Sequence, residues 1–535
     1  MLRRIRSILL ADERKKMLWA TASSFVNVVL DLAGIAALLP VLYFLLERDG
    51  SLRTVMLFCA AALLLILLKC VSSIVLTRYQ NSVLLALYRR LSCSVYRAFY
   101  SRGLLFVNSK GVNRIGYEVN SVCYSFSQGL LAVLMRMFGD LLFILVAMVL
   151  LLIWSPAVSL VLLASFIPYT VIYVFAVRRQ LEVLGEREQA ARRGQWELTA
   201  DTFEGWSAVE TTGSFPHFAS AFRRGTAEIS DVRLKMSVYS RLPLFLSELA
   251  AASGICLMAL WGDGDVKVVV GVFALAAFRL LPALRSVVSG WTQVKNLSCT
   301  LDIISDALRE DGEEDGEAVQ CPTFARELRL ENIRYTYPDG EKVLDGFSMV
   351  VSKGECLGIK GFSGSGKTTL FNLMLGFLEP DSGTLTLDGK AFTQPLRRAF
   401  LSKVGYVPQE VHVFSGSLLE NIALGDPSPN REKAERLLEA VGLSAWVDGL
   451  PSGLDTPVKN ALSGGQHQRL GMARALYRDI ELLLLDEATS ALDNDSEALV
   501  NGMLLSLRGN RGLTVVSIAH RESSLALCDR VISIK

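Results

Sequence analysis

A glycine-rich stretch, Gly361–Thr369, carries the clearest chemical signal, because its letters GFSGSGKTT fit the phosphate-binding pattern G-x-x-x-x-G-K-[ST]. Glycines let successive backbone N–H groups turn toward phosphate oxygens, and the loop opens a helix whose N-terminus favours anions. Lys367 is expected to reach the β- and γ-phosphates of a nucleotide, and the Thr368 hydroxyl to bind Mg²⁺. The segment Glu355–Ile359 supplies the strand that such a loop follows, which disfavours a chance glycine-rich turn. The other loop residues expected around the phosphates are Gly361, Ser363, Gly364, Ser365, Gly366 and Thr369.

A second signal is the acidic pair Asp486-Glu487, which follows the leucine run Leu482–Leu485. A strand buried in a parallel sheet reads as continuous apolar sequence, and ligands bind at the carboxyl ends of such strands. We expect Asp486 to hold Mg²⁺, directly or through water, and Glu487 to polarise the attacking water. Two adjacent carboxylates repel each other, so a metal ion explains the pair better than the alternative of a surface Asp-Glu at a strand end.

A third motif, ALSGGQHQR at Ala461–Arg469, allows a comparison with a known family. Together with the phosphate loop, the acidic pair and His520, it resembles the ATP-binding cassette (ABC) transporters, whose signature is LSGGQ. The resemblance covers the whole chain, as a half-size exporter with six membrane spans followed by one cassette. It implies ATP hydrolysis coupled to transport, with ATP and Mg²⁺ as cofactors.

The resemblance also implies roles for three residues outside these motifs. Tyr337, in a Tyr-Pro pair, would stack on adenine, and Gln409 would bridge Mg²⁺ and the membrane domain. His520 would hold the γ-phosphate and the attacking water. Each has an ordinary alternative (strand packing, a surface amide and a strand-end histidine), but all occur in the family's order.

The signature implies a second copy of the chain. A signature serine cannot fold back onto its own phosphate loop, so each ATP is expected between two cassettes, and a homodimer with two equivalent sites is the economical arrangement. Asp493, in Ser-Ala-Leu-Asp, would sit across the dimer seam. With Glu487 present, both sites are expected to hydrolyse ATP through positioning and charge stabilisation. The residues implied to contact the γ-phosphate of the other copy's ATP are Ser463, Gly464, Gly465 and Gln466.

The elements that must position these residues divide into a membrane part and a cassette. Hydrophobic residues make up 51% of the sequence, which is high for a soluble protein, and the excess lies in residues 1–305. The formal net charge of +2 does not indicate a nucleic-acid partner, and the nine cysteines show neither disulfide nor metal spacing. The apolar segments of spanning length lie near Met17–Leu46, Leu52–Thr77, Met137–Trp154, Ala157–Val177, Pro243–Trp261 and Val266–Ser289.

The distribution of Lys and Arg predicts that both ends of the chain lie in the cytoplasm, as in a multi-pass protein of the inner membrane. Lys and Arg are frequent before the first span and after the second and fourth, and scarce in the other connections. The long connections 78–136 and 178–242 are expected to be helical extensions with turns near Asn108–Gly111 and Gly205–Gly213, although disordered loops are an alternative. An acidic linker is expected at 306–324, followed by an α/β phosphate-loop domain at 325–535.

The cargo is suggested by short matches in the last two spans. Ala276–Pro282, and Arg241-Leu242-Pro243 with Glu248, resemble the lipid-linked oligosaccharide flippases, which implies a polyprenyl-pyrophosphate glycan moved to the outer leaflet. A charge at membrane depth usually has a task, and Arg279 and Arg285 could bind a pyrophosphate bidentately. Alternatively, Arg279 pairs with Glu248, or Arg285 lies near the cytoplasmic end. Membrane lipid and an amphipathic substrate are therefore the expected partners.

Three departures from the family pattern accompany this interpretation. The segment Thr456–Ala461 is short where exporters usually carry Gly-Glu-x-Gly, the sequence ends at Lys535 where further strands and a helix usually follow, and Glu47–Ser51 is shorter than the outer segment of the flippases. The alternatives are a multidrug, lipid or peptide exporter, a gating or regulatory ABC protein, and a cassette ATPase acting on nucleic acid. Glu487 speaks against the second alternative and the six spans against the third.

Overall fold

The computed structural model describes residues 1–47, 52–154, 156–176, 178–261, 266–309, 320–362, 364–459 and 462–534. The chain forms two compact units, one of Met1–Arg102 with Phe106–Gly312 and one of Gly103–Leu105 with Glu313–Lys535. We call the first the helical unit and the second the cassette. Residues 310–319 of the expected acidic linker lie outside the described residues.

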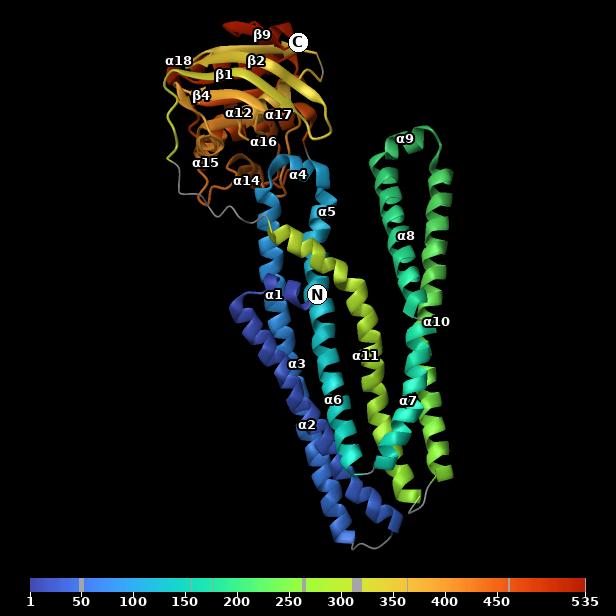
Figure 1. Ribbon diagram of the computed structural model, residues 1–535. Helices are drawn as coiled ribbons and strands as arrows, with labels where there is room; N and C mark the ends of the chain where they lie inside the picture. Colours follow the sequence, from blue (N-terminus) through green and yellow to red (C-terminus); the bar gives the residue numbers. More distant parts are fainter. Residues whose placement is uncertain are drawn as a thin grey trace. The chain divides into compact units, whose positions relative to one another are not determined.

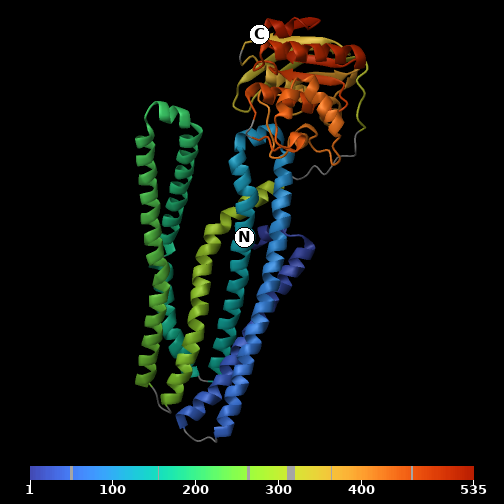
Figure 2. The same cartoon turned by 180° about the vertical axis from the view of Figure 1, so that it is seen from behind.

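The helical unit consists of long helices joined by short turns (Figure 1). The two connections predicted to be helical are helical: α3 continues without a break through residue 101, and α8 and α10 lie side by side in both Figure 1 and Figure 2. Glycines permit the turns, because Gly103, Gly111 and Gly213 all have positive φ angles. The helices are α1 (Leu2–Ile8), α2 (Ala11–Glu47), α3 (Leu52–Ser101), α4 (Gly103–Lys110), α5 (Val112–Tyr117), η1 (Glu118–Val122), η2 (Ser125–Leu131), α6 (Ala132–Trp154), α7 (Pro156–Ala176), α8 (Arg178–Glu204), α9 (Trp206–Thr211), α10 (Phe215–Trp261) and α11 (Val266–Arg309).

Three stretches of the described residues are long and apolar enough to cross a membrane: Ala11–Gly34, Met56–Ser101 and Val112–Ile153. Many apolar side chains in the first half of α3 point outward, such as Leu57 (71% exposed) and Leu64 (70% exposed), which is the expected arrangement for a helix that faces lipid. The six expected spans are not individually confirmed, because the segments predicted near 157–177, 243–261 and 266–289 fall on α7, α10 and α11 and are not among these three stretches of the described residues.

The cassette contains two sheets. One is antiparallel with strand order β2-β1-β4-β5, and the other is parallel with strand order β6-β7-β8-β3-β9, which confirms the predicted α/β class. The strands are β1 (Glu327–Thr336), β2 (Lys342–Ser352), β3 (Cys356–Gly361), β4 (Ser382–Leu387), β5 (Lys390–Ala391), β6 (Val404–Val407), β7 (Leu482–Asp486), β8 (Thr514–Ile518) and β9 (Arg530–Ile534). The helices are α12 (Lys367–Met374), α13 (Gln394–Phe400), η3 (Leu401–Lys403), α14 (Leu418–Ile422), α15 (Arg431–Ala440), α16 (Ser444–Asp448), η4 (Gly453–Asp455), α17 (Gly464–Tyr477), α18 (Asn494–Arg511) and α19 (Glu522–Leu525).

The leucine run explains how the parallel sheet is covered. Every residue of β7 is buried; Leu482 and Leu484 belong to one apolar cluster, and Leu483 and Leu485 belong to another. Successive side chains of a strand point to opposite faces, so the two clusters lie on the two faces of the sheet. Polar side chains that follow β3, β6, β7 and β8 are therefore confined to the edge where these parallel strands end.

Asp388 fixes the start of the cassette. It lies between β4 and β5 with a φ of 51°, and its carboxylate accepts the backbone N–H groups of Ala325 (2.7 Å), Arg326 (2.7 Å) and Glu327 (2.9 Å). Burial alone would raise the pKa of Asp388, but the three N–H donors outweigh it, so this pKa lies below its usual value. The carboxylate thus anchors the residues that lead into β1.

We predict that Asp388→Asn lowers the stability of the cassette by about 2 kcal/mol, because an amide cannot replace a carboxylate that accepts from three donors. Because the native pKa is depressed, this stabilisation is complete at neutral pH and is lost as the pH falls through the native pKa. Thermal unfolding of the full chain at pH 7 and at acidic pH measures both effects. Asp448→Asn, at an exposed position of the same unit, is the control. Equal midpoints for the two variants at pH 7 would contradict the anchoring role.

Candidate functional site

The phosphate loop connects the end of β3 to α12 and depends on glycines for its path. Gly366 caps α12 with a φ of 88°, and a Cβ placed there would lie 2.5 Å from Cγ1 of Val343. A Cβ on Gly361 would lie 2.5 Å from Oγ of Ser365, whose buried hydroxyl has no hydrogen-bond partner within the described residues. Gly364 also has a positive φ, of 81°. Of the predicted loop residues, Ser363 lies outside the described residues.

Lys367 lies across its own loop. Its side chain is buried, and Nζ donates to the carbonyl oxygens of Gly361 (3.0 Å) and Phe362 (2.8 Å). A phosphate at this helix N-terminus would exchange those carbonyl contacts for stronger, charge-assisted ones. The loop thus holds the Lys367 ammonium group against its own carbonyl oxygens.

Thr368 and Asp486 meet where the predicted metal would bind. The Thr368 hydroxyl donates to Oδ2 of Asp486 at 2.9 Å, and Asp486 is only 2% exposed. Burial raises the pKa of Asp486, and the charge of Glu487 adds to this, while the hydrogen bond from Thr368 works in the opposite direction. A buried carboxylate and a hydroxyl are the oxygen ligands that Mg²⁺ prefers, so these residues fit the ion.

The rest of the Mg²⁺ shell would come from outside this pair. Within the described residues, no three His, Cys, Asp or Glu side chains form a metal-binding group. Mg²⁺ is usually held by one or two carboxylates together with substrate phosphates and water, so a single buried Asp beside a phosphate loop suits it.

Glu487 lies between the two other predicted polar residues of this edge. Its Oε1 is 2.9 Å from Nε2 of His520, and its Oε2 accepts a hydrogen bond from Nε2 of Gln409 at 3.1 Å. The Glu487 backbone has a φ of 49°, which is unusual for a residue with a Cβ. Its N–H bonds to the carbonyl of Ile518 at 3.0 Å, which fixes this conformation. The carboxylate is therefore held between the Gln409 amide and the His520 imidazole.

Tyr337 lies beside the phosphate loop. Its hydroxyl is 3.1 Å from Oγ1 of Thr369, and its ring makes an edge contact with Tyr335 at 5.1 Å between centroids. The predicted adenine platform and the phosphate loop are therefore connected by one hydrogen bond.

The signature forms a second location on the cassette. Ser463 caps α17 through a reciprocal capping box with Gln466, and both Ser463 and Gly464 are exposed. A Cβ on Gly465 would lie 3.0 Å from the carbonyl oxygen of Ala491. Within the described residues, no hydrogen bond joins Ser463–Gln466 to the phosphate loop. Asp493 is the N-cap of α18 and is also exposed.

Two residues that the sequence analysis missed hold this edge together. Gln468 is buried, donates to the Glu487 carbonyl (3.2 Å) and the Ser490 hydroxyl (3.0 Å), and accepts from the N–H of Ala491 (3.0 Å). Arg521 donates to the carbonyls of Ser490 (2.9 Å) and Leu492 (3.0 Å) and pairs with buried Glu497 at 3.4 Å. Their only sequence signal was position, because Gln468 follows the signature and Arg521 follows His520.

Comparisons with known proteins find similar proteins along most of the chain. The sequence profile described as "ABC transporter" matches residues 344–490. A protein of Ralstonia nicotianae named ATP-dependent lipid A-core flippase is 30% identical over 473 residues, covering 85% of this chain and 78% of that protein. A Burkholderia pseudomallei protein of the same name is 29% identical and covers 94% of this chain and 85% of its own length. The structure of a bacterial Atm1-family ABC exporter with ATP bound has a TM-score of 0.80 at 21% identity and covers 98% of this chain and 93% of that chain, so the folds agree.

We predict that Arg521→Ala lowers kcat for ATP hydrolysis about thirtyfold, because two hydrogen bonds of about 1 kcal/mol each are lost where Glu487 and His520 are positioned. KM for ATP should change little, since the hydrogen bonds of Arg521 to backbone groups, among the described residues, go to Ser490 and Leu492 and not to the phosphate loop. Arg521→Lys, which can reach one carbonyl, should recover part of the rate. Arg436→Ala, on the surface of α15, is the control. A parallel rise in KM with unchanged kcat would argue against a positioning role.

Proposed function

The chain belongs to the ABC transporter family, and from this premise we propose that two copies form an ATP-driven exporter that moves a lipid substrate across the membrane. One observation supports the proposed dimer. Each chain has a phosphate loop beside a buried carboxylate, and a separate exposed signature at the N-terminus of α17. A helix N-terminus of this kind attracts anions, so the signature of one copy can receive the γ-phosphate held by the other.

In this proposal the residues of the edge divide the work of hydrolysis. Tyr337 would bind the base, and Lys367 and the loop N–H groups would bind the phosphates. Mg²⁺, held by Thr368, Asp486 and the Gln409 amide oxygen, would neutralise charge on the phosphates. Glu487 would accept a proton from the attacking water, while His520 orients that carboxylate and the γ-phosphate. The residues that would clasp ATP from the second copy are Ser463, Gly464, Gly465, Gln466 and Asp493.

For the membrane arrangement, we infer that both ends of the chain and the cassette lie in the cytoplasm and that the protein resides in the inner membrane. The distribution of Lys and Arg supports this orientation. ATP is supplied on the same side, which is consistent with it.

For the cargo, the names of the curated relatives support a lipid. The sequence resemblance narrows this to a lipid-linked oligosaccharide with an anionic head. Arg285 of α11 supports an anionic head because its side chain is exposed in an apolar helix, whereas the side chain of Arg279 lies outside the described residues. ATPase stimulation and leaflet transfer in vesicles, measured over lipids, lipid-linked sugars, drugs and peptides, separate this proposal from a general exporter.

We predict that Glu487→Gln retains ATP binding but lowers turnover by about a hundredfold or more, because the general base is lost while the hydrogen bonds to Gln409 and His520 can be partly kept. The variant should accumulate as a nucleotide-loaded closed dimer, detectable by cross-linking and by bound nucleotide. Glu439→Gln, on α15, is the control. Near-normal ATPase would remove Glu487 from the role, and single chains that hydrolyse ATP at the full rate would contradict the dimer.

We predict that Arg285→Ala reduces substrate-stimulated ATPase severalfold and leaves basal ATPase unchanged, since only the charged head of the cargo is affected. The same comparison applies to Arg279→Ala. Arg89→Ala, at an exposed position of α3, is the control. Equal loss of stimulated and basal activity would indicate that the arginine has a structural role instead.

A further inference from the structure

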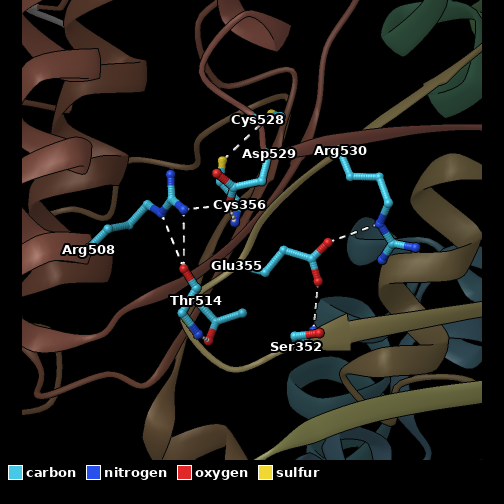
Figure 3. A network of polar contacts seen from close by, with 9 residues as sticks. Ser352, Glu355, Cys356, Arg508, Thr514, Cys528, Asp529 and Arg530 are labelled. Atoms are coloured by element: carbon cyan, nitrogen blue, oxygen red, sulfur yellow. Dashed lines mark hydrogen bonds and ion pairs between the residues drawn. The ribbon is translucent and has the colours of Figure 1, made fainter.

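Two cysteines of the cassette face each other beside the strand β3 of the parallel sheet. Cys356 is the first residue of β3, and Cys528 lies between α19 and β9. Their sulfur atoms are 3.6 Å apart and share a hydrogen bond, as Figure 3 shows. All nine cysteines are free thiols, so this pair is reduced. The distance exceeds a disulfide bond length of about 2.05 Å by only about 1.5 Å.

The backbone around the pair is held on both sides by polar contacts (Figure 3). The N–H of Cys356 donates to the Asp529 carboxylate, and the N–H of Asp529 donates to the Cys356 carbonyl, both at 2.8 Å. Arg508 of α18 bonds to the same carboxylate and to the carbonyl of Gly354 at 3.3 Å. Glu355 pairs with Arg530 at 3.0 Å. These contacts hold the backbone of both cysteines in place, so the sulfur atoms can meet without unfolding of the strands.

The surroundings shift the pKa values of the two thiols in opposite directions. The hydrogen bond with Cys528 lowers the pKa of Cys356, helped by Arg508 and opposed by burial and by the charges of Asp529 and Glu355. The same hydrogen bond, together with burial, raises the pKa of Cys528. Cys356 is thus the better nucleophile and Cys528 the better holder of the proton, which are the two roles that a reactive pair requires.

The pair is accessible to a small oxidant. Cys528 is partly exposed, while Cys356 is buried but lines a cavity of about 30 Å³ together with Arg508 and Ser524. This space holds a molecule about the size of water. A hydroperoxide as small as hydrogen peroxide can enter it after a small displacement of the lining.

The pair also lies on two chain segments that lead to parts of the candidate site. The strand that begins at Cys356 ends in the phosphate loop at Gly361, and the segment that ends at Cys528 begins just after His520. The sulfur of Cys528 packs on β3 so closely that a Cβ on Gly358 would lie 3.1 Å from it. A change at the pair is therefore transmitted to backbone that leads to Lys367 on one side and to His520 on the other.

We propose that Cys356 and Cys528 form an oxidation site, which closes to an intramolecular disulfide in the presence of a hydroperoxide and then slows ATP hydrolysis. The Cys356 thiolate attacks one peroxide oxygen, the O–O bond breaks, and the released hydroxide takes up the thiol's proton to give water. Cys528 then attacks the sulfenic sulfur, the S–O bond breaks, and the leaving oxygen departs as a second water with the Cys528 proton. Two thiols are oxidised by two electrons, and one hydrogen peroxide is reduced to two waters. In a reducing cytosol such a bond is transient, as suits a sensor.

The test uses the full chain in lipid vesicles, treated with hydrogen peroxide and then alkylated. Peptide mapping without reductant should find the peptides of Cys356 and Cys528 joined, with the mass of two lost hydrogens. ATP hydrolysis should fall severalfold and recover with dithiothreitol. Cys528→Ser should keep its ATPase under peroxide and accumulate a sulfenic acid on Cys356 that dimedone labels. Cys93→Ser, which removes an exposed cysteine of the helical unit, should respond like the unchanged protein.

Three results would overturn the proposal. An equal loss of ATPase in Cys528→Ser would place the oxidised group elsewhere. A disulfide that forms without a change in hydrolysis would remove the regulatory effect. Absence of the joined peptides at peroxide concentrations that oxidise Cys93 would show that the pair is not reactive. Cys528 is partly exposed, so its serine variant carries the test even if Cys356→Ser folds poorly.

Discussion

The strand order β6-β7-β8-β3-β9 is the constraint on which the candidate site depends. It places β8 between β3, which ends in the phosphate loop, and β7, which ends in Asp486. His520 follows the central strand β8, so it emerges between the phosphate loop and the acidic pair. Because all these strands are parallel, their carboxyl ends share one edge of the sheet. Four motifs that are far apart in the sequence therefore come together at this edge through the path of the backbone.

The edge is stabilised mainly by bonds to backbone groups. Glu487 keeps a left-handed conformation because its N–H bonds to the Ile518 carbonyl and its carbonyl accepts from Gln468. Arg521 binds two carbonyls of the segment that follows the acidic pair. Buried backbone groups need hydrogen-bond partners. The side chains of Gln468 and Arg521 supply several of them and so fix the path of the whole segment that follows the acidic pair. The direction of the Glu487 carboxylate is a consequence of that path.

The dependence of this edge on bonds to backbone groups explains which parts of the site could be predicted from the sequence. Lys367, Thr368 and Asp486 were predictable because their chemistry is encoded locally, in a glycine pattern and in a leucine run that ends in acids. Gln468, Arg521 and Asp388 were not, because each binds backbone groups that any residue could supply, at positions far away in the sequence. The α/β class followed from alternating strand and helix signals, whereas the antiparallel second sheet depends on long-range pairing that no local pattern specified. The roles carried over from the family, such as that of the signature, could be inferred only by comparison, since the hydrogen bonds of Ser463 among the described residues stay within its own helix turn.

The helical unit meets a different constraint, which is length. The helix α3 has 50 residues and α10 has 47, so at 1.5 Å per residue each is about 70–75 Å long. The hydrocarbon core of a bilayer is about 30 Å thick, so more than half of α3 must extend beyond it. The composition agrees, because α3 passes from an outward-facing apolar half into a half that carries Arg78, Arg89 and Arg97. A continuous helix cannot bend sharply without a break in its hydrogen bonds, and among the described residues of α3 there is neither proline nor glycine. A displacement at one end of such a helix is therefore transmitted to the other as a rigid tilt.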